Sequence, residues 1–317
     1  MHTISIQKGK GLIGAFSSIL ETPIDNNGRI NVPARFGQGY LQAFNFNPGL
    51  RMMVRDYELK GKIPIKKSGP NCFTESVILL FQNISLTGAE RDKLIPSVQV
   101  FPEHIDAESL FPDITVSRSI AIAVKVAYLK ELLKGDLVNE ILSAITRPDQ
   151  TFFFEVLLPL SIAKVTNEIL RADVPVALHN FYFKVKAEEL ICLLFSELLK
   201  RENTSVASLS IADMQTIYKI RDSLYSRLNI PPDVSALALK ANWSKSKLTR
   251  LFKQIFGTGI FQYYQALRMQ EAARLLKAKK LSVSEVGYEM GFTNLSHFTR
   301  TFEKHTGMKP KKYAQSG

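Results

Sequence analysis

Two short segments near the end of the chain combine side chains that could recognise a nucleic acid. Each has apolar residues three and four positions apart, as in a helix with one buried face: Leu248, Leu251 and Phe252 in residues 244–254, and Leu295 or Phe298 with Phe302 in residues 294–304. The opposite faces carry Lys245, Ser246, Thr249, Arg250 and Lys253, and then Ser296, His297, Thr299 and Arg300. Because arginine can bond bidentately to guanine in the major groove, the pattern favours two helices that contact DNA bases. The alternative is a pair of surface helices whose polar faces have no such role.

The two segments occupy corresponding places in an internal repeat. Residues 237–264 align with residues 286–314, at an offset of 49 positions at first and 50 later. The matched pairs are Ala238 with Gly287, Trp243 with Phe292, Leu248 with Phe298, Thr249 with Thr299, Arg250 with Arg300, Phe252 with Phe302, Gly257 with Gly307 and Tyr263 with Tyr313. The change of offset falls in a turn, where an inserted residue is well tolerated. Duplication of the whole unit favours a functional role for both polar faces.

Each copy is predicted to fold as a helix-turn-helix unit. In the first copy, residues 234–240 form a helix, Asn242 makes the turn and Ser244 caps the next helix. In the second copy the corresponding residues are Ser282 or Ser284 as the first N-cap, Gly291 in the turn, and Thr293 or Asn294 as the second N-cap. The small residues Ala238 and Gly287 suit two helices that cross steeply over a short turn and approach closely there.

Residues 259–276 connect the two copies and contain no glycine or proline after Gly259. Their alanine and leucine content and the three-to-four spacing of apolar residues predict one long helix. Such a helix would hold the two reading helices at a fixed distance. Adjacent major-groove segments on one side of DNA are about 34 Å apart, so we expect one chain to read two segments one turn apart.

The positive charge of the chain is concentrated in the same region. The whole chain carries a net charge of +12, and residues 211–317 hold 18 Lys and Arg against 7 Asp and Glu, a net charge of +11. Residues 1–210 are nearly neutral, with a net charge of +1. A basic domain at one end of a protein favours a polyanionic partner such as a nucleic acid, because each phosphate that it neutralises releases counterions. Charge alone also allows an anionic membrane surface, or no partner at all.

Residues 211–317 closely resemble the DNA-binding domain of the AraC/XylS family of bacterial transcription regulators. The resemblance rests on these ordered motifs: Leu237-Ala238, Leu248-Thr249-Arg250-Leu251-Phe252-Lys253, Phe256-Gly257-Thr258, the run from Leu267 to Leu276, Gly291-Phe292-Thr293-Asn294-Leu295-Ser296-His297-Phe298-Thr299-Arg300-Thr301-Phe302, and Gly307-Met308-Lys309-Pro310-Lys311-Lys312-Tyr313. The sequence departs from the family pattern at Gly287, where alanine is usual, and at Glu303, where lysine is usual.

The resemblance implies both site residues and partners. By position, it assigns base contacts to Ser246, Thr249, Arg250, Leu295, Ser296, His297 and Arg300. Contacts to the DNA backbone are expected from Ser244, Lys245, Lys253, Asn294, Lys304, Lys311 and Lys312. The implied partners are double-stranded operator DNA, RNA polymerase, a second copy of the chain in a homodimer, and an unidentified small-molecule effector. We therefore expect a sequence-specific regulator that activates bacterial promoters in response to a small molecule, in the cytoplasm at the nucleoid.

The first two-thirds of the chain predict a β-rich domain that ends in helices. A hairpin is expected at residues 26–28, a turn at 47–49, and strands at 50–57, 77–81 and 114–126. Helices are expected at residues 128–134, 136–146, 152–170 and 181–201. The predicted fold class is thus α+β with two domains: a cupin-like barrel or sandwich followed by helices, then an all-α double helix-turn-helix domain. We expect the first domain at 1–202, a linker at 203–210 and the second domain at 211–317.

The last helix of the first domain has an apolar stripe with two interpretations. It contains Ala187, Leu190, Ile191, Leu194, Phe195 and Leu198. The stripe could form the seam of a homodimer, or it could pack onto the sheet of its own chain, as such stripes more often do. A binding chamber for the effector is expected within residues 1–126, but no lining residues can be named, because pockets and cores use the same residue types.

Several other kinds of protein are disfavoured by the sequence. No apolar run reaches the roughly 18 residues of a membrane span, and the N-terminus lacks the pattern of a secretion signal. Cys72 and Cys192 lie far apart and are expected to be small buried side chains. The five histidines have no close ligand spacing, so we expect no metal site and no cofactor. A hydrogen bond from His297 to a base or phosphate is the preferred interpretation of that residue.

Two other functions would use the same basic domain. One is an enzyme tethered to DNA, but the sequence lacks the Gly-x-Ser-x-Gly, phosphate-binding glycine loop and His-Glu-x-x-His motifs, and no catalytic residue is expected. The other is a nonspecific architectural protein, whose binding would depend on salt but hardly on DNA sequence.

Overall fold

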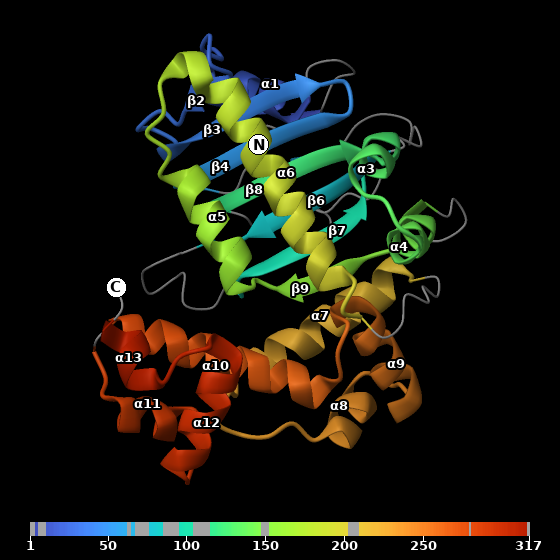
Figure 1. Cartoon of the computed structure of the whole chain (residues 1–317), viewed down its shortest axis with the longest axis vertical. Helices are drawn as coiled ribbons and strands as arrows, with labels where there is room; N and C mark the ends of the chain where they lie inside the picture. The colour runs from blue at the N-terminus through green and yellow to red at the C-terminus, as the bar shows by residue number, and fades with distance from the viewer. Residues whose placement is uncertain are drawn as a thin grey trace. The chain divides into compact units, whose positions relative to one another are not determined.

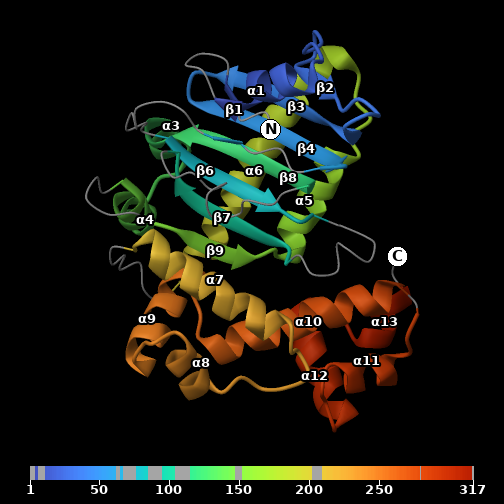
Figure 2. The ribbon, with the colours of Figure 1, turned by 180° about the vertical axis from the view of Figure 1, so that it is seen from behind.

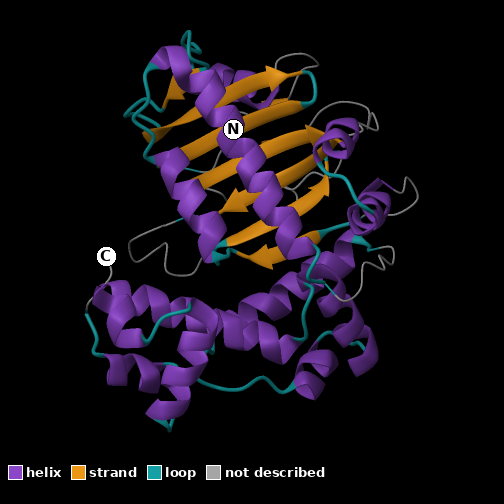
Figure 3. Cartoon of the chain, in the orientation of Figure 1, coloured by secondary structure: helices purple, strands orange, loops and turns teal. Residues whose placement is uncertain are grey.

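The computed structural model of the chain describes residues 4–5, 11–61, 65–66, 76–84, 95–103, 115–146, 152–201, 209–278 and 280–315. The chain divides into two compact units, Met1–Leu209 and Ser210–Gly317. Among the described residues, all strands belong to the first unit, and the second unit is helical (Figure 3). Of the linker predicted at 203–210, residues 203–208 lie outside the described residues.

The first unit is built on an antiparallel sheet with the strand order β2-β3-β4-β8-β6-β7-β9 (Figure 1). The strands are β2 (Arg29–Asn31), β3 (Gly37–Asn47), β4 (Leu50–Leu59), β6 (Ser76–Gln82), β7 (Ser97–Pro102), β8 (Val116–Lys125) and β9 (Phe154–Leu157). A separate two-residue parallel pair is formed by β1 (Ile4–Ser5) and β5 (Ile65–Lys66). Since β2 and β9 are the two edges of an open sheet, the described strands do not close into the expected cupin-like barrel. No second large sheet completes a sandwich in this part of the chain.

Side chains alternate between two faces of this sheet. The α6 face carries the main apolar core, in which Ile120 and Ile122 of β8 pack with helices α5 (Leu160–Leu170) and α6 (His179–Leu198). The opposite α1 face carries a smaller core, in which Phe16 of helix α1 (Gly11–Leu20) packs with Leu41 and Tyr57. Figure 1 shows α5 and α6 across the first face, and Figure 2 shows the second face with α1 at the β2-β3-β4 end. Helices α3 (Val126–Leu132) and α4 (Asp136–Thr146) and the short η1 (Val176–Leu178) complete the described elements of the unit.

Most expected elements of the first unit are present, but the helix predicted at 152–170 is wrong in its first part. Residues 154–157 form the edge strand β9, which pairs with β7, and the helix begins only after Pro159. The run Phe152-Phe153-Phe154 explains the difference, because aromatic residues fill a sheet well and the fixed backbone of proline suits the start of a helix. Helix α1 and strands β3 and β7 were not predicted. The hairpin expected at residues 26–28 is wrong, because residues 22–25 form no strand and β2 pairs with β3 instead.

The apolar stripe of α6 packs inside its own unit. Ala187, Leu190, Ile191, Leu194, Phe195 and Leu198 are each at most 1 % exposed and belong to the main core. The interpretation of this stripe as core is therefore confirmed, and the stripe is not available as a dimer seam. Cys192, in contrast, is exposed on α6, so the expectation of a buried cysteine is wrong there, while Cys72 lies outside the described residues.

The second unit consists of seven described helices. They are α7 (Ile211–Tyr225), α8 (Val234–Lys240), α9 (Lys245–Phe256), α10 (Ile260–Ala278), α11 (Val283–Glu289), α12 (Leu295–Thr306) and α13 (Pro310–Gln315). Helix α10 is the predicted long connector, and it contacts α7, α9, α11, α12 and α13. Its Tyr263 and Tyr264 are almost completely buried. Across the described residues of both units, no helix is long and apolar enough to span a membrane.

Candidate DNA interface

The first repeat copy forms a helix-turn-helix unit from α8 and α9. Asp233 caps α8, since its Oδ1 accepts hydrogen bonds from the backbone of Ser235 and Ala236. Asn242 adopts a left-handed backbone with φ of 54°, as expected for the turn. Ser244 then caps α9 through a bond of 3.1 Å from Lys247 N to its Oγ. Asp233 was not identified from the sequence, although its position before an apolar helix is typical of an N-cap.

The second copy forms the same unit from α11 and α12. Ser282, rather than Ser284, caps α11 in a capping box in which Ser282 and Glu285 bond to each other's backbone N–H. Gly291 makes the turn with φ of 74°. Asn294, rather than Thr293, caps α12, because its Oδ1 accepts hydrogen bonds from Ser296 N and His297 N at 2.9 and 3.1 Å.

Backbone hydrogen bonds repeat between the two copies at the matched positions. In the turns, Trp243 N donates to Ala238 O and Phe292 N donates to Gly287 O, each at 3.0 Å. The two reading helices also end alike. Gly257 and Gly307 are left-handed C-caps with φ of 71° and 73°, and the N–H of each donates to a carbonyl four residues earlier at 2.8 Å. The sequence repeat is therefore a structural repeat.

The predicted contact residues lie mostly on the exposed sides of α9 and α12. Among the expected base contacts, the exposed residues are Ser246, Thr249, Arg250, Ser296, His297 and Arg300. Among the expected backbone contacts, the exposed residues are Ser244, Lys245, Asn294, Lys304, Lys311 and Lys312, and Lys253 is half-buried. The side chains of Ser244 and Asn294 already act as N-caps. Both helices thus present a polar face with one exposed arginine at the same repeat position.

Leu295 differs from the other expected base contacts because it is half-buried. Its side chain packs on Gly287, where an added Cβ would lie 2.7 Å from Leu295 Cδ2. The departure from the family's alanine at position 287 therefore makes room for Leu295. The buried core of α12 is formed by Phe298 and Phe302.

Arg268 of α10 links the connector to the second turn, and the sequence did not reveal this role. Its Nε donates to Met290 O at 2.9 Å, its Nη2 bonds to the same carbonyl, and its guanidinium lies 4.0 Å from the centre of the Phe292 ring. Burial lowers the pKa of Arg268 from its ordinary value. Because Met290 and Phe292 flank Gly291, this arginine fixes the turn that sets the position of α12. An arginine within the regular pattern of α10 gives no sequence signal for such a contact.

The capping box of α11 predicts a stability effect that depends on pH. We expect Ser282→Ala to lower the free energy of unfolding of the second unit by about 1 kcal/mol, while Ser284→Ala changes it little. The hydrogen bonds from Ser282 hold the pKa of the Glu285 carboxyl below its ordinary value. The contribution of Glu285 is thus present above its unfolded pKa and is lost as the pH falls through its folded pKa. Trp243 is the one tryptophan of the chain, so its fluorescence during urea unfolding follows this unit. Equal effects of the two serine variants would contradict the assignment.

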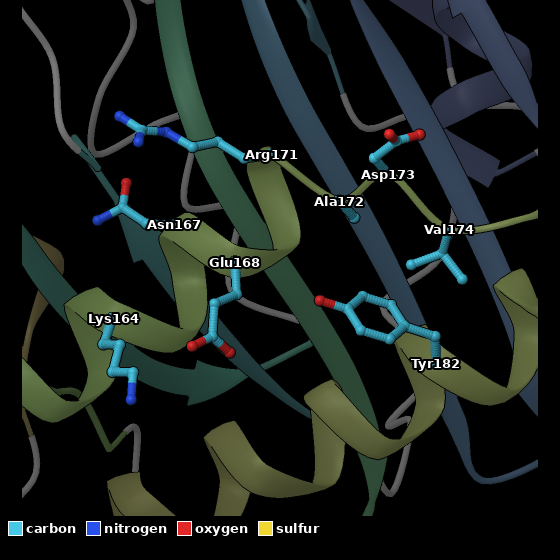
Figure 4. Close-up of a pocket in the computed structure, with 8 residues that line it drawn as sticks. All are labelled: Lys164, Asn167, Glu168, Arg171, Ala172, Asp173, Val174 and Tyr182. Atoms are coloured by element: carbon cyan, nitrogen blue, oxygen red, sulfur yellow. The ribbon is translucent and has the colours of Figure 1, made fainter.

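A surface pocket in the first unit lies outside the region where the sequence placed the effector chamber. It has a volume of about 610 Å³ and lies between α5 and α6 (Figure 4). Its lining residues are Lys164, Asn167, Glu168, Arg171, Ala172, Asp173, Val174 and Tyr182. Glu168 is already bonded by Lys186 Nζ at 2.5 Å. In the described part of the chain, no group of three or more histidine, cysteine or acidic residues is placed to hold a metal ion.

Two helix-turn-helix units with matching turns and caps lie in one basic region and define a DNA-binding domain. Comparisons with known proteins support this assignment. A helix-turn-helix domain family matches residues 237–316. Over 84 residues the chain is 33 % identical to the probable transcription factor PqrA of Proteus vulgaris. These residues cover 26 % of this chain and 69 % of PqrA. The chain belongs to the AraC family of DNA-binding transcription regulators.

Other relatives match a smaller share of their own length. The transcriptional activator RhaR of Salmonella heidelberg (strain SL476) is 30 % identical over 131 residues, which cover 40 % of this chain and 46 % of RhaR. The DNA-binding domain of AdpA, solved in complex with a target DNA, is 26 % identical and has a TM-score of 0.30, with coverage of 32 % of this chain and 91 % of that domain. The chain thus spans less than half of RhaR.

Proposed function

We propose that the chain is a sequence-specific regulator that reads two neighbouring major-groove segments with α9 and α12. The observation that carries this proposal is the equal placement of Arg250 and Arg300 on the exposed faces of two identically terminated helices. The proposed base contacts are Ser246, Thr249, Arg250, Leu295, Ser296, His297 and Arg300. The proposed backbone contacts are Ser244, Lys245, Lys253, Asn294, Lys304, Lys311 and Lys312. In this proposal the chain acts by binding DNA and not by catalysis.

Selection of bound fragments from random DNA by the full-length protein tests this function. We expect a motif with two boxes whose centres are about one helical turn apart, because two readers joined by α10 approach one side of the duplex. Binding that depends on salt but enriches no motif would instead indicate the nonspecific architectural role.

The first unit is proposed to be the sensory part of the regulator. Its net charge is close to zero, which gives it no evident role in DNA binding. The relative RhaR is a transcriptional activator, which supports the proposal that this chain activates bacterial promoters. Activation would make RNA polymerase a partner and would place the protein in the cytoplasm, at the nucleoid. We propose a small-molecule effector in the first unit that alters how α9 and α12 are presented to DNA. Binding of effector and operator should then be reciprocally coupled, typically by about 1–3 kcal/mol.

A homodimer is proposed through a surface other than the buried stripe of α6. Leu178, Phe181 and Val185 are exposed at the start of that helix, and Phe181 is 71 % exposed. We expect residues 211–317 alone to bind DNA as a monomer, and the full chain to bind paired sites more tightly. The measurements are affinities for single and paired sites and the solution mass of both proteins. A monomeric full chain with no preference for paired sites would exclude the dimer.

A further inference from the structure

The two faces of the sheet in the first unit differ in the size of their side chains. On the α6 face, β8 carries Ile120, Ile122 and Val124, which are fully buried. On the α1 face, the same strand carries the small side chains of Ser117, Ser119, Ala121 and Ala123, and only its last residue on this face, the exposed Lys125, is long. Because protein interiors are close-packed, small side chains on a central strand leave room for another group to pack over the sheet.

Arg55 lies beside this strip of small residues. In the sheet register it stands on β4 between Leu41 of β3 and Ser119 of β8. The residue is 8 % exposed, and its Nε is buried without a hydrogen-bond partner. In the described part of the chain, no ion pair joins Arg55 to a carboxylate, and the adjacent Asp56 points to the other face, where it bonds Arg118 Nε at 3.0 Å. Burying a charged hydrogen-bond donor without an acceptor is costly in free energy. A bound anion that accepts a hydrogen bond from Arg55 Nε would offset this cost.

Further polar groups continue from Arg55 across the same face. The hydroxyls of Ser117 and Ser119 are buried and lie 2.9 Å apart. Beyond them, Gln82 Nε2 donates to Ser97 Oγ, and Gln99 Nε2 donates to Glu155 Oε2, each at 3.1 Å. Guanidinium and hydroxyl groups are both donors that can surround an oxyanion. The face thus has a cationic residue at Arg55, neutral hydroxyl and amide groups next to it, and the buried Glu155 carboxylate at its far edge on β9.

We propose that Arg55, Ser117 and Ser119 bind the carboxylate or phosphate group of a small effector on the α1 face of the sheet. The oxyanion supplies the acceptor that Arg55 Nε lacks, and the body of the effector lies over the small side chains of β8. This inference rests on the proposed sensory function and specifies its ligand as an anion. The pocket between α5 and α6 fits this role less well, because its lining mixes Lys164 and Arg171 with the carboxylates of Glu168 and Asp173.

Calorimetric titration of the full-length protein tests the site. Inorganic phosphate is titrated first, then phosphate esters and small carboxylic acids, at constant ionic strength with sodium chloride as the reference. We expect at least one oxyanion to bind the wild type, and Arg55→Gln to weaken that binding about tenfold or more, because a charge-assisted bond is lost. The responding series identifies the group as phosphate or carboxylate. Without an oxyanion, Arg55→Gln should unfold at the same or a higher temperature than the wild type, since an unpaired buried charge is removed.

Arg51→Gln is the matched control. Arg51 lies on the same strand and face, but it is exposed and paired with Glu103 at 3.0 Å, so its removal should leave oxyanion affinity unchanged. If Arg55→Gln does not fold, Arg55→Lys keeps the charge but loses the Nε donor, and it should also bind more weakly. The proposal is overturned if, for every oxyanion of the panel, the affinity of the wild type is no higher than that of the Arg55 variant. DNA binding of the same samples keeps the two questions apart: Arg55→Gln should retain the selected DNA motif, whatever happens to oxyanion binding.

Discussion

Gly291→Ala is expected to destabilise the second unit by roughly 3 kcal/mol or more. Two independent effects add at this turn. The φ of 74° is a left-handed backbone that costs alanine about 1–2 kcal/mol. In addition, the new Cβ would lie 2.3 Å from the backbone oxygen of Asn229, which precedes α8 and cannot move like a flexible side chain. Urea unfolding followed by the fluorescence of Trp243 measures the loss, and binding to the selected DNA motif should weaken as α12 shifts.

Gly307→Ala separates the two effects. Gly307 has nearly the same φ, 73°, but an added Cβ would have no heavy atom within 4 Å. This variant should therefore lose only the backbone term, about 1–2 kcal/mol. If the free energy of unfolding fell by the same amount in both glycine variants, the close approach of Asn229 to the second turn would be incorrect.

Arg250→Ala and Arg300→Ala are each expected to weaken binding to the specific site by about 1–3 kcal/mol. Both arginines are exposed at the same repeat position, and a bidentate bond to guanine discriminates against other bases. Each variant should also relax base preference at one position, in one box for Arg250 and in the other for Arg300. Repeating the random-DNA selection with each variant measures both effects.

Lys245→Ala is a useful comparison, because Lys245 is exposed at the start of α9 and is proposed to contact the DNA backbone. Its loss should weaken binding to all sequences to a similar degree and reduce the slope of log affinity against log salt by about 1. Arginine variants that behave in the same way, with unchanged base preference, would show that Arg250 and Arg300 contact only phosphate.

The second unit could be predicted closely from its sequence because its determinants are local. Turn residues such as Asn242 and Gly291 and the N-cap Ser244 act within a few positions of themselves, and the repeat provided a second example of each. The contact of Arg268 with Met290 joins residues 22 positions apart. Nothing in the helical pattern of α10 distinguishes this arginine from one exposed to solvent, so only the folded structure reveals it.

The first unit was less predictable because its fold depends on pairing between distant strands. The segment 152–157 is apolar except for Glu155 and fits a helix or a buried strand equally well, and pairing with β7 decides for the strand. Similarly, the alternation in Ser117-Arg118-Ser119-Ile120-Ala121 predicts a strand but does not show which of its sides faces the main core. The burial of Arg55 became apparent only when its neighbours Leu41 and Ser119 were placed.

We expect one chain to bind two groove segments at once, with α9 and α12 acting as a rigid pair of readers. This expectation is tested most directly by measuring the affinity of the full-length protein for the selected site after about five base pairs, half a helical turn, are inserted between the boxes. The insertion moves one box to the opposite side of the duplex. We therefore expect the affinity to fall to about the value measured for DNA with a single box. A control insertion of the same length outside the boxes should have no effect. Unchanged affinity after the insertion between the boxes would contradict simultaneous reading by α9 and α12.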